Sequence, residues 1–126
     1  MPVTYDRKLA FEVLTQIYDA IQKIKKRFDP VNSAEQFTNS DEGMEKLDAI
    51  CMQLVAIGEG LKNVDSMTDK KLLVQYPQIE WKKVKGLRDI ISHHYFDVDA
   101  EAIFDVCTNH IPTLADTLDV ILRDIS

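Results

Sequence analysis

The residues of this sequence that are best suited to chemistry stand together in the stretch GLRDIISHHYFDVD, positions 86–99. Arg88 is followed after four residues by His93, and then by His94 and Tyr95. An arginine can bind a phosphate group and neutralise developing charge, and a histidine can transfer a proton near neutral pH. If the arginine, the histidine and the tyrosine lie close together, they suit phosphodiester chemistry.

A regular helix would not bring all of these residues to one side. At about 100° per residue, Arg88 lies within about 40° of Tyr95 but about 140° from His93. Arg88 and His93 therefore meet only if the helix ends there or if a second copy of the chain contributes. Asp89 stands one turn before His93, which is close enough for its carboxylate to orient the imidazole.

The same residues also fit a purely structural role. His93 and His94 can stand at the C-terminal end of a helix because the helix dipole favours them there, and Tyr95 can pack back on the fold. Without further information, the chemical and the structural interpretations both stay open.

Positive charge gathers just before this stretch, at Lys82, Lys83 and Lys85. The net charge of the whole chain is −6, which argues against a dedicated, non-specific nucleic-acid binder. The lysines are either a solvated helix face or a local basic surface that binds a polyanion such as RNA.

Hydrophobic periodicity predicts the elements that must position these residues. The 126 residues fit a single domain, residues 1–126, with a core of its own. No window alternates as a strand does, so we expect an all-α, up-and-down bundle of four main helices plus a short helix. The main helices are expected to end at Asp29-Pro30, to start near Ser40 and near Ile79, and to start after Asp99, with a loop over 31–40, a short segment over 68–77 and a kink near 108–111 caused by Pro112.

Other sites are disfavoured by their spacing. The segment GEGLKN at 58–63 has no preceding strand and no third glycine, so it is not a phosphate-binding loop, and we expect its glycines to allow two helices to approach closely. Cys107 and His110 are three residues apart, but Cys51 is expected on another helix, and a zinc site needs three or four converging ligands. We therefore expect no metal site and no cofactor.

Residues 76–104, YPQIEWKKVKGLRDIISHHYFDVDAEAIF, resemble the signature of the HEPN superfamily, and specifically its HepT-like branch. The matching pattern is arginine, four residues, histidine, one residue and tyrosine, filled here by Arg88, His93 and Tyr95. The resemblance extends to AIGEGLKNV at 56–64 and to IPTL at 111–114. The position after the arginine is often asparagine in that family, and here it is Asp89.

The resemblance implies a HEPN-like homodimer whose two motifs face each other in a shared cleft. It also implies a metal-independent endoribonuclease in which Arg88 and His93 are catalytic, while Asp89 and Tyr95 support the site and His94 has no assigned role. Many relatives are toxins that a small nucleotidyltransferase, the MNT-type antitoxin, neutralises by transferring AMP to the motif tyrosine, here Tyr95. Lys82, Lys83 and Lys85 would then supply the basic surface for RNA.

A second class of function stays open. The chain could be a non-catalytic binding module that partners a nucleotidyltransferase and presents a nucleotide or substrate to it. The arginine, the histidine and the tyrosine favour the ribonuclease toxin, since a scaffold has no chemical need for all three. Two single cysteines and the lack of a signal peptide or a long apolar run predict a reduced, cytoplasmic protein with no membrane partner.

Overall fold

The structure, a computed structural model, describes residues 5–93 and 98–126, and of Ile90, Ser92 and His93 it describes the backbone alone. Within these residues every regular element is helical, which confirms the all-α prediction. The elements are α1 (Arg7–Phe28), α2 (Glu35–Thr38), α3 (Asp41–Met67), the 3-10 helix η1 (Leu73–Gln75), α4 (Trp81–His93), α5 (Ala100–Asp105), the π-helix η2 (Val106–His110) and α6 (Ile111–Ile125).

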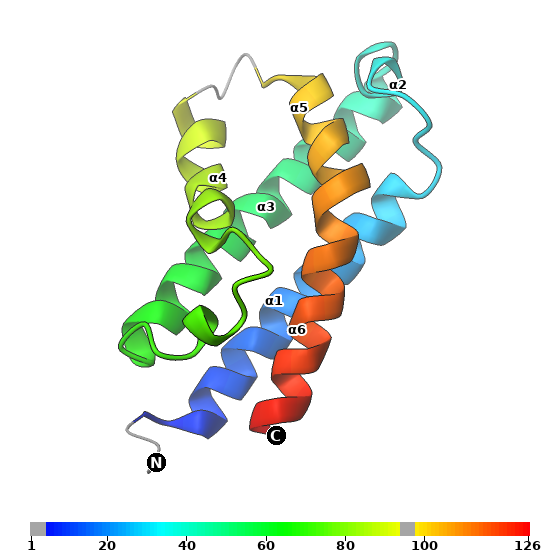
Figure 1. The fold of residues 1–126 in the computed structure, drawn as a ribbon. Helices are drawn as coiled ribbons and strands as arrows, with labels where there is room; N and C mark the ends of the chain where they lie inside the picture. Colours follow the sequence, from blue (N-terminus) through cyan, green and yellow to red (C-terminus); the bar gives the residue numbers. More distant parts are fainter. Residues whose placement is uncertain (1–4, 94–97) are drawn as a thin grey trace.

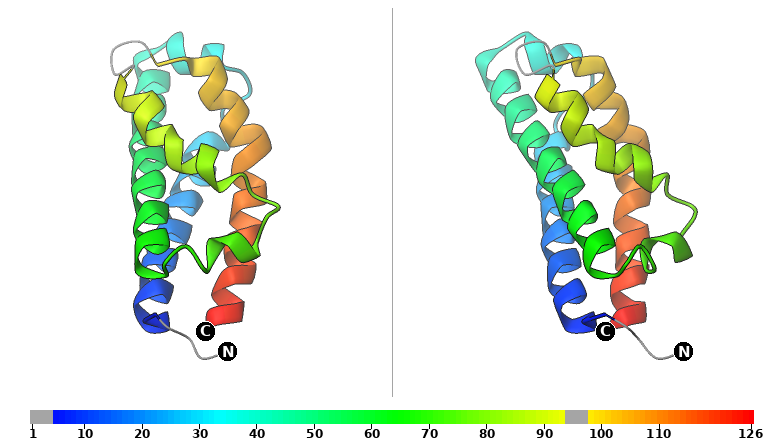
Figure 2. Two further views of the ribbon diagram at one scale, coloured as in Figure 1. Left: turned by 60° about the vertical axis from the view of Figure 1, so that its left-hand side comes forward. Right: turned by 90° about the vertical axis from the view of Figure 1, so that its left-hand side faces the viewer.

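The long helices run up and down in chain order (Figure 1). Helix α1 rises from the N-terminal end, α3 returns, α4 rises along α3, and α5, η2 and α6 descend together to the C-terminus. The start of α1 and the end of α6 lie at the same end of the bundle, as Figure 2 also shows. Helix α3 packs on both α1 and α4, and α6 packs on α1, so α4 is held mainly by α3.

The core forms where the apolar stripes of α1, α3 and α6 meet. Its fully buried side chains recur at helical spacings of three, four or seven residues on these helices: Leu14, Ile21, Ile24, Ile50, Leu54, Ile57, Leu61, Leu118 and Ile121. Burying a large aliphatic side chain stabilises the fold by about 1.5–3 kcal/mol, so these stripes are the main source of stability.

Three helix boundaries follow from local chemistry that the sequence displayed. The Ser40 hydroxyl accepts a hydrogen bond from Gly43 N–H at 3.0 Å, and the Asp99 carboxylate accepts from Glu101 N–H at 3.0 Å. At Pro112, which has no N–H, the chain widens over residues 106–110 into a π-helix, and Ile111 N–H bonds to Val106 O. The expected break before Pro112 is confirmed.

Two local predictions need correction. Residues 31–40 are not only a loop, since they contain helix α2, whose Phe37 is fully buried. The backbone of α2 lies directly against α3, so that a Cβ on Gly43 would stand 1.9 Å from Gln36 O. Helix α4 starts at Trp81 rather than near Ile79. No helix in the described residues is long and apolar enough to cross a membrane.

Candidate active site

Helix α4 carries the predicted site between a side buried in the core and a side exposed to solvent. Trp81 and Ile91 are buried, and Val84 is partly buried against the core. The Trp81 indole N–H donates a hydrogen bond to Tyr76 O at 2.9 Å, which fixes the start of the helix. Arg88 lies on nearly the same helical line as Trp81, and its side chain is 45% exposed. Arg88 is thus at the boundary between the α3 contact and solvent.

The Arg88 guanidinium lies between two carboxylates. Its Nε is 2.5 Å from Oε1 of Glu59 on α3, and its Nη1 is 3.7 Å from Oδ1 of Asp89. Glu59 Oε1 is buried and has no hydrogen-bond partner of normal geometry among the described residues, so the contact with Nε is a charge contact that is poorly aligned as a hydrogen bond. Asp89 was predicted to orient His93, and its carboxylate lies beside Arg88.

The approach of α3 to α4 at Arg88 depends on Gly58. A Cβ on this glycine would stand 3.3 Å from Lys85 O and 3.5 Å from Arg88 Cβ. On the other side, a Cβ on Gly60 would stand 2.7 Å from Ile17 Cγ1 on α1. Both glycines therefore permit close helix contacts, as the sequence suggested, and Glu59 between them reaches Arg88.

The three lysines predicted to bind RNA lie in different environments. The ammonium of Lys85 is in contact with the carboxylate of Asp65 on α3, and these side chains are only 24% and 12% exposed. Lys83 Nζ lies 2.7 Å from Glu80 Oε2, and each group stabilises the charge of the other: the pKa of Glu80 is lowered and that of Lys83 is raised by their hydrogen bond. Lys82 is exposed and has no ion pair among the described residues.

The remaining motif residues fall at the end of the description. The backbone of α4 stays helical as far as His93, whose side chain lies outside the described part. His94 and Tyr95 lie outside the described residues, so their predicted roles stay predictions.

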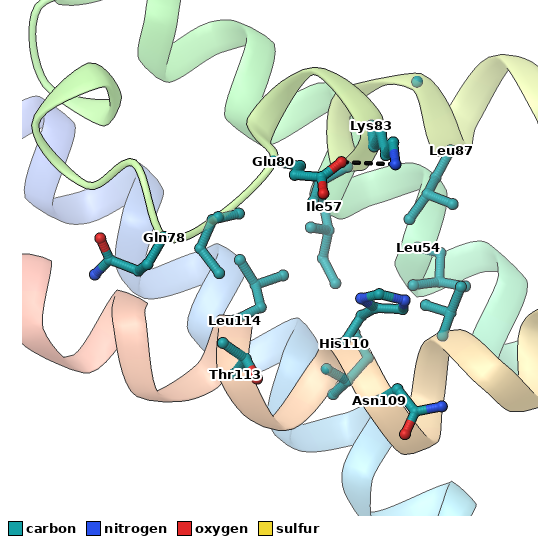
Figure 3. Close-up of a pocket in the computed structure, with 15 residues that line it drawn as sticks. Leu54, Ile57, Gln78, Glu80, Lys83, Leu87, Asn109, His110, Thr113 and Leu114 are labelled. Carbon is teal, nitrogen blue, oxygen red and sulfur yellow. Dashed lines mark ion pairs between the residues drawn. The ribbon is translucent and has the colours of Figure 1, made fainter.

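A cleft of about 570 Å³ opens between α4 and the η2–α6 segment, with α3 as its floor. Figure 3 shows the Glu80–Lys83 pair on one rim and His110 and Asn109 on the other. The apolar lining includes Leu54 and Ile57 of α3, Leu87 of α4 and Leu114 of α6. Because Leu87 and Lys83 lie about 100° and 140° around α4 from Arg88, this cleft is on another side of the helix than the Arg88–Asp89 pair.

The cysteines do not provide a nucleophile. Cys51 and Cys107 are both free and buried. Burial raises the pKa of the Cys51 thiol to about 11 and that of Cys107 to about 12, so both are neutral near pH 7. Among the described side chains, no three His, Cys, Asp or Glu residues gather as metal ligands would.

Sequence reasoning missed Glu59 and Asp65, the two acidic residues of α3 that hold Arg88 and Lys85. One signal was available for Glu59, which lies between the two glycines predicted to permit close helix contacts.

Comparison with known proteins assigns this chain to a family. Residues 17–121 match the model of the family described as "Ribonuclease HepT-like". The protein "Putative RNase MJ0127" of Methanocaldococcus jannaschii is 31% identical over 116 residues, which is 90% of either chain. "Probable ribonuclease HepT" of Thermococcus cleftensis is 35% identical over 66 residues, 52% of this chain and 56% of that protein. No solved structure matches this chain.

Proposed function

Because this chain belongs to the HepT-like ribonuclease family, we propose that it is a metal-independent endoribonuclease with Arg88 and His93 as its catalytic residues. The family match over residues 17–121, which spans the whole motif, carries the proposal. The placement of Arg88 supports it, because a guanidinium that is half exposed and held from the α3 side can receive a phosphate from solvent.

The proposed reaction uses the RNA's own 2′-hydroxyl. The 2′-oxygen attacks the adjacent phosphorus as a base removes its proton, and the bond from phosphorus to the 5′-oxygen breaks. An acid protonates the leaving 5′-oxygen, which yields a 2′,3′-cyclic phosphate and a 5′-hydroxyl end. His93 has the chemistry of the base or the acid, and Arg88 stabilises the charge that develops on the phosphate.

A homodimer would supply both proton-transfer groups. Helix α4 ends at His93 and its backbone is helical up to that residue, so positions 88 and 93 lie about 140° apart around the helix axis. A second copy of the chain is the way we propose to combine the two side chains. The exposed side of α3 supports such a contact, because Met52 is 67% exposed on the same line as Glu59. We propose a two-fold interface built from α3 and α4 that brings two motifs into one cleft.

RNA binding requires positive charge near the proposed cleft between the two copies, although the chain as a whole is acidic. Lys82 lies about 20° around α4 from Asp89, it is exposed, and it is the lysine we propose to contact phosphates. Lys85 is engaged with Asp65, and Lys83 lies on the rim of the cleft shown in Figure 3. Their contributions to RNA binding should be smaller.

The resemblance to the HepT-like branch also suggests how the enzyme is controlled. We propose that the chain is a toxin whose partner is an MNT-type nucleotidyltransferase that adds AMP to Tyr95. An added AMP would place a bulky anion near Arg88, so it would occupy the phosphate site and repel RNA. Tyr95→Phe should then escape silencing by the partner and ATP, which intact-mass spectrometry and an RNA cleavage assay test together.

The decisive experiment is incubation of the purified protein, unmodified at Tyr95, with RNA in EDTA. Cleavage that produces a 2′,3′-cyclic phosphate is expected, together with its loss in Arg88→Ala and in His93→Ala. His94→Ala is the matched control and should keep most activity. Activity that depends on an added metal, or products without a cyclic phosphate or its hydrolysis product, would contradict the mechanism.

A further inference from the structure

We propose that Glu59 is a positioning residue for Arg88: it fixes the guanidinium through Nε, so that the opposite edge receives the phosphate. The inference rests on the proposed function and adds a residue from α3 to a site otherwise built from α4. It starts from the contact of 2.5 Å between Glu59 Oε1 and Arg88 Nε.

Partial burial of the Glu59 carboxylate favours this contact with Arg88. The Oε1 atom of Glu59 is buried although its side chain as a whole is 45% exposed. A buried carboxylate oxygen is costly unless a positive group or a donor faces it, and the Arg88 Nε is in that place. Glu59 therefore limits the rotation of a side chain that would otherwise sample many rotamers at the surface.

The position of Glu59 is itself fixed by its neighbours. Gly58 allows α3 to approach the α4 backbone at Lys85 and Arg88, while Gly60 allows Ile17 of α1 to pack against the opposite side. A side chain at either glycine would change the separation that the Glu59–Arg88 contact requires. The segment from Gly58 to Gly60 thus brings α1, α3 and α4 into contact near the residue from which the Arg88 side chain projects.

The contact with Glu59 also determines which N–H donors of Arg88 remain available to a phosphate. Guanidinium groups bind phosphates best with two parallel N–H donors. Glu59 engages Nε, and Asp89 lies 3.7 Å from Nη1, which leaves the Nη1–Nη2 edge for a phosphate. A phosphate that displaces the exposed Asp89 from this edge would still leave Nε held by Glu59. Arg88 would then need little reordering when RNA binds.

The first test replaces Glu59 in the full-length protein. Glu59→Ala should lower kcat/KM for RNA by about 100-fold, mainly through kcat, because a misplaced group costs most in the transition state. Glu59→Gln keeps the shape of the side chain but removes the negative charge on which the contact depends, so it should recover only part of this loss. The matched control is Glu42→Ala, which removes another glutamate of α3 from a contact with a cation, 3.3 Å from Lys46, and should not alter kcat.

The second test observes the Arg88 side chain by NMR and does not depend on RNA cleavage. In wild type the Arg88 Nε–H should give a distinct NMR signal because the Glu59 carboxylate lies beside it, and Glu59→Ala should broaden this signal or shift it to the free-arginine position. Titration with a 2′-deoxy oligonucleotide, which this mechanism cannot cleave, should perturb wild-type Arg88 and bind Glu59→Ala more weakly. In an Arg88→Lys background, Glu59→Ala should add little, since lysine lacks the fork that Glu59 orients.

The outcomes separate the two proposals. If wild type cleaves RNA but Glu59→Ala keeps its kcat and its Arg88 signal, the positioning role is wrong and the ribonuclease proposal stands. Equal losses of kcat in Glu59→Gln and Glu59→Ala would also overturn the positioning role. If wild type fails to cleave RNA while Glu59→Ala releases the Arg88 signal and weakens oligonucleotide binding, Glu59 positions an anion-binding arginine in a protein that is not a ribonuclease.

Discussion

Asp65 of α3 and Lys85 of α4 form an ion pair that is largely shielded from solvent, three residues before Arg88 along α4. Together with the Glu59–Arg88 contact, it places two acidic residues of α3 against two basic residues of α4. Since α4 is held mainly by α3, these charged contacts help to set the register of the two helices.

Lys85→Met should destabilise the protein because it leaves the Asp65 carboxylate without its cation. We expect the free energy of unfolding to fall by roughly 2–3 kcal/mol, somewhat less than for a fully buried pair, as measured by urea denaturation. The double variant Asp65→Asn/Lys85→Met should recover part of the loss. Lys83→Met, which breaks only an exposed pair, is the control and should change stability little.

Lys82→Gln should weaken RNA binding while leaving stability unchanged. If Lys82 contacts one phosphate, its loss should make the slope of log K against log salt smaller by about 1. The adjacent variant Lys83→Gln makes the same change of charge, on a residue already paired with Glu80, and should have a smaller effect. Equal effects of the two variants would indicate a diffuse basic surface instead of a contact by Lys82.

Substitutions at two glycines on facing helices should change the stability of the fold in opposite directions. A Cβ on Gly86 meets nothing within 4 Å, so Gly86→Ala should raise stability by about 0.5–1 kcal/mol through helix propensity. Gly58→Val should cost about 1–3 kcal/mol, because its side chain would press on the backbone oxygens of Lys85 and Val84. It should also lower RNA cleavage beyond its effect on the folded fraction, because it separates Glu59 from Arg88. Thermal unfolding and activity at 15 °C check both expectations.

The two buried thiols make stability depend on alkaline pH. Their pKa values in the folded state are about 11 for Cys51 and about 12 for Cys107, above the ordinary value of 9.0, mainly because of burial. The folded chain therefore keeps protons that the unfolded chain loses. The free energy of unfolding should be unaffected by the thiols below about pH 9 and should fall as the pH rises from 9 toward 11.

Urea denaturation between pH 8 and pH 10.5 measures this fall, and the Cys51→Ala/Cys107→Ala variant should show a shallower one despite its lower stability. A thiol-specific reagent at pH 8 should react slowly with the folded protein and at once in urea. Rapid reaction of the native thiols would contradict the assignment of both cysteines to the core.

Local sequence chemistry predicted the helices well, whereas the contacts between helices needed the structure. The caps at Ser40 and Asp99 and the break before Pro112 depend on residues within a few positions, so they are visible in the sequence. The helix in 31–40 was missed because that segment is polar and turn-rich, although Phe37 anchors it in the core.

The candidate site divides in the same way. The motif and the exposed placement of Arg88 beside a buried stripe follow from the helical pattern of α4 alone. The partners Glu59 and Asp65 depend on which side of α3 packs against α4, and periodicity gives the width of an apolar face without naming its neighbour. Lys85 therefore looked like an RNA-binding residue in the sequence, although its ammonium is paired within the fold.

The proposed dimer gives the last prediction, which compares two equally exposed apolar residues. Met52 is 67% exposed on the side of α3 beside Glu59, and Val74 is 68% exposed on η1. If α3 and α4 form the two-fold interface, Met52→Asp brings two like charges close together across it, so the protein should become monomeric and lose RNA cleavage. Val74→Asp should leave both the dimer mass in solution and the RNA cleavage activity unchanged. Sedimentation at micromolar concentration with a parallel cleavage assay decides it, and a fully active Met52→Asp monomer would show that one chain suffices for catalysis.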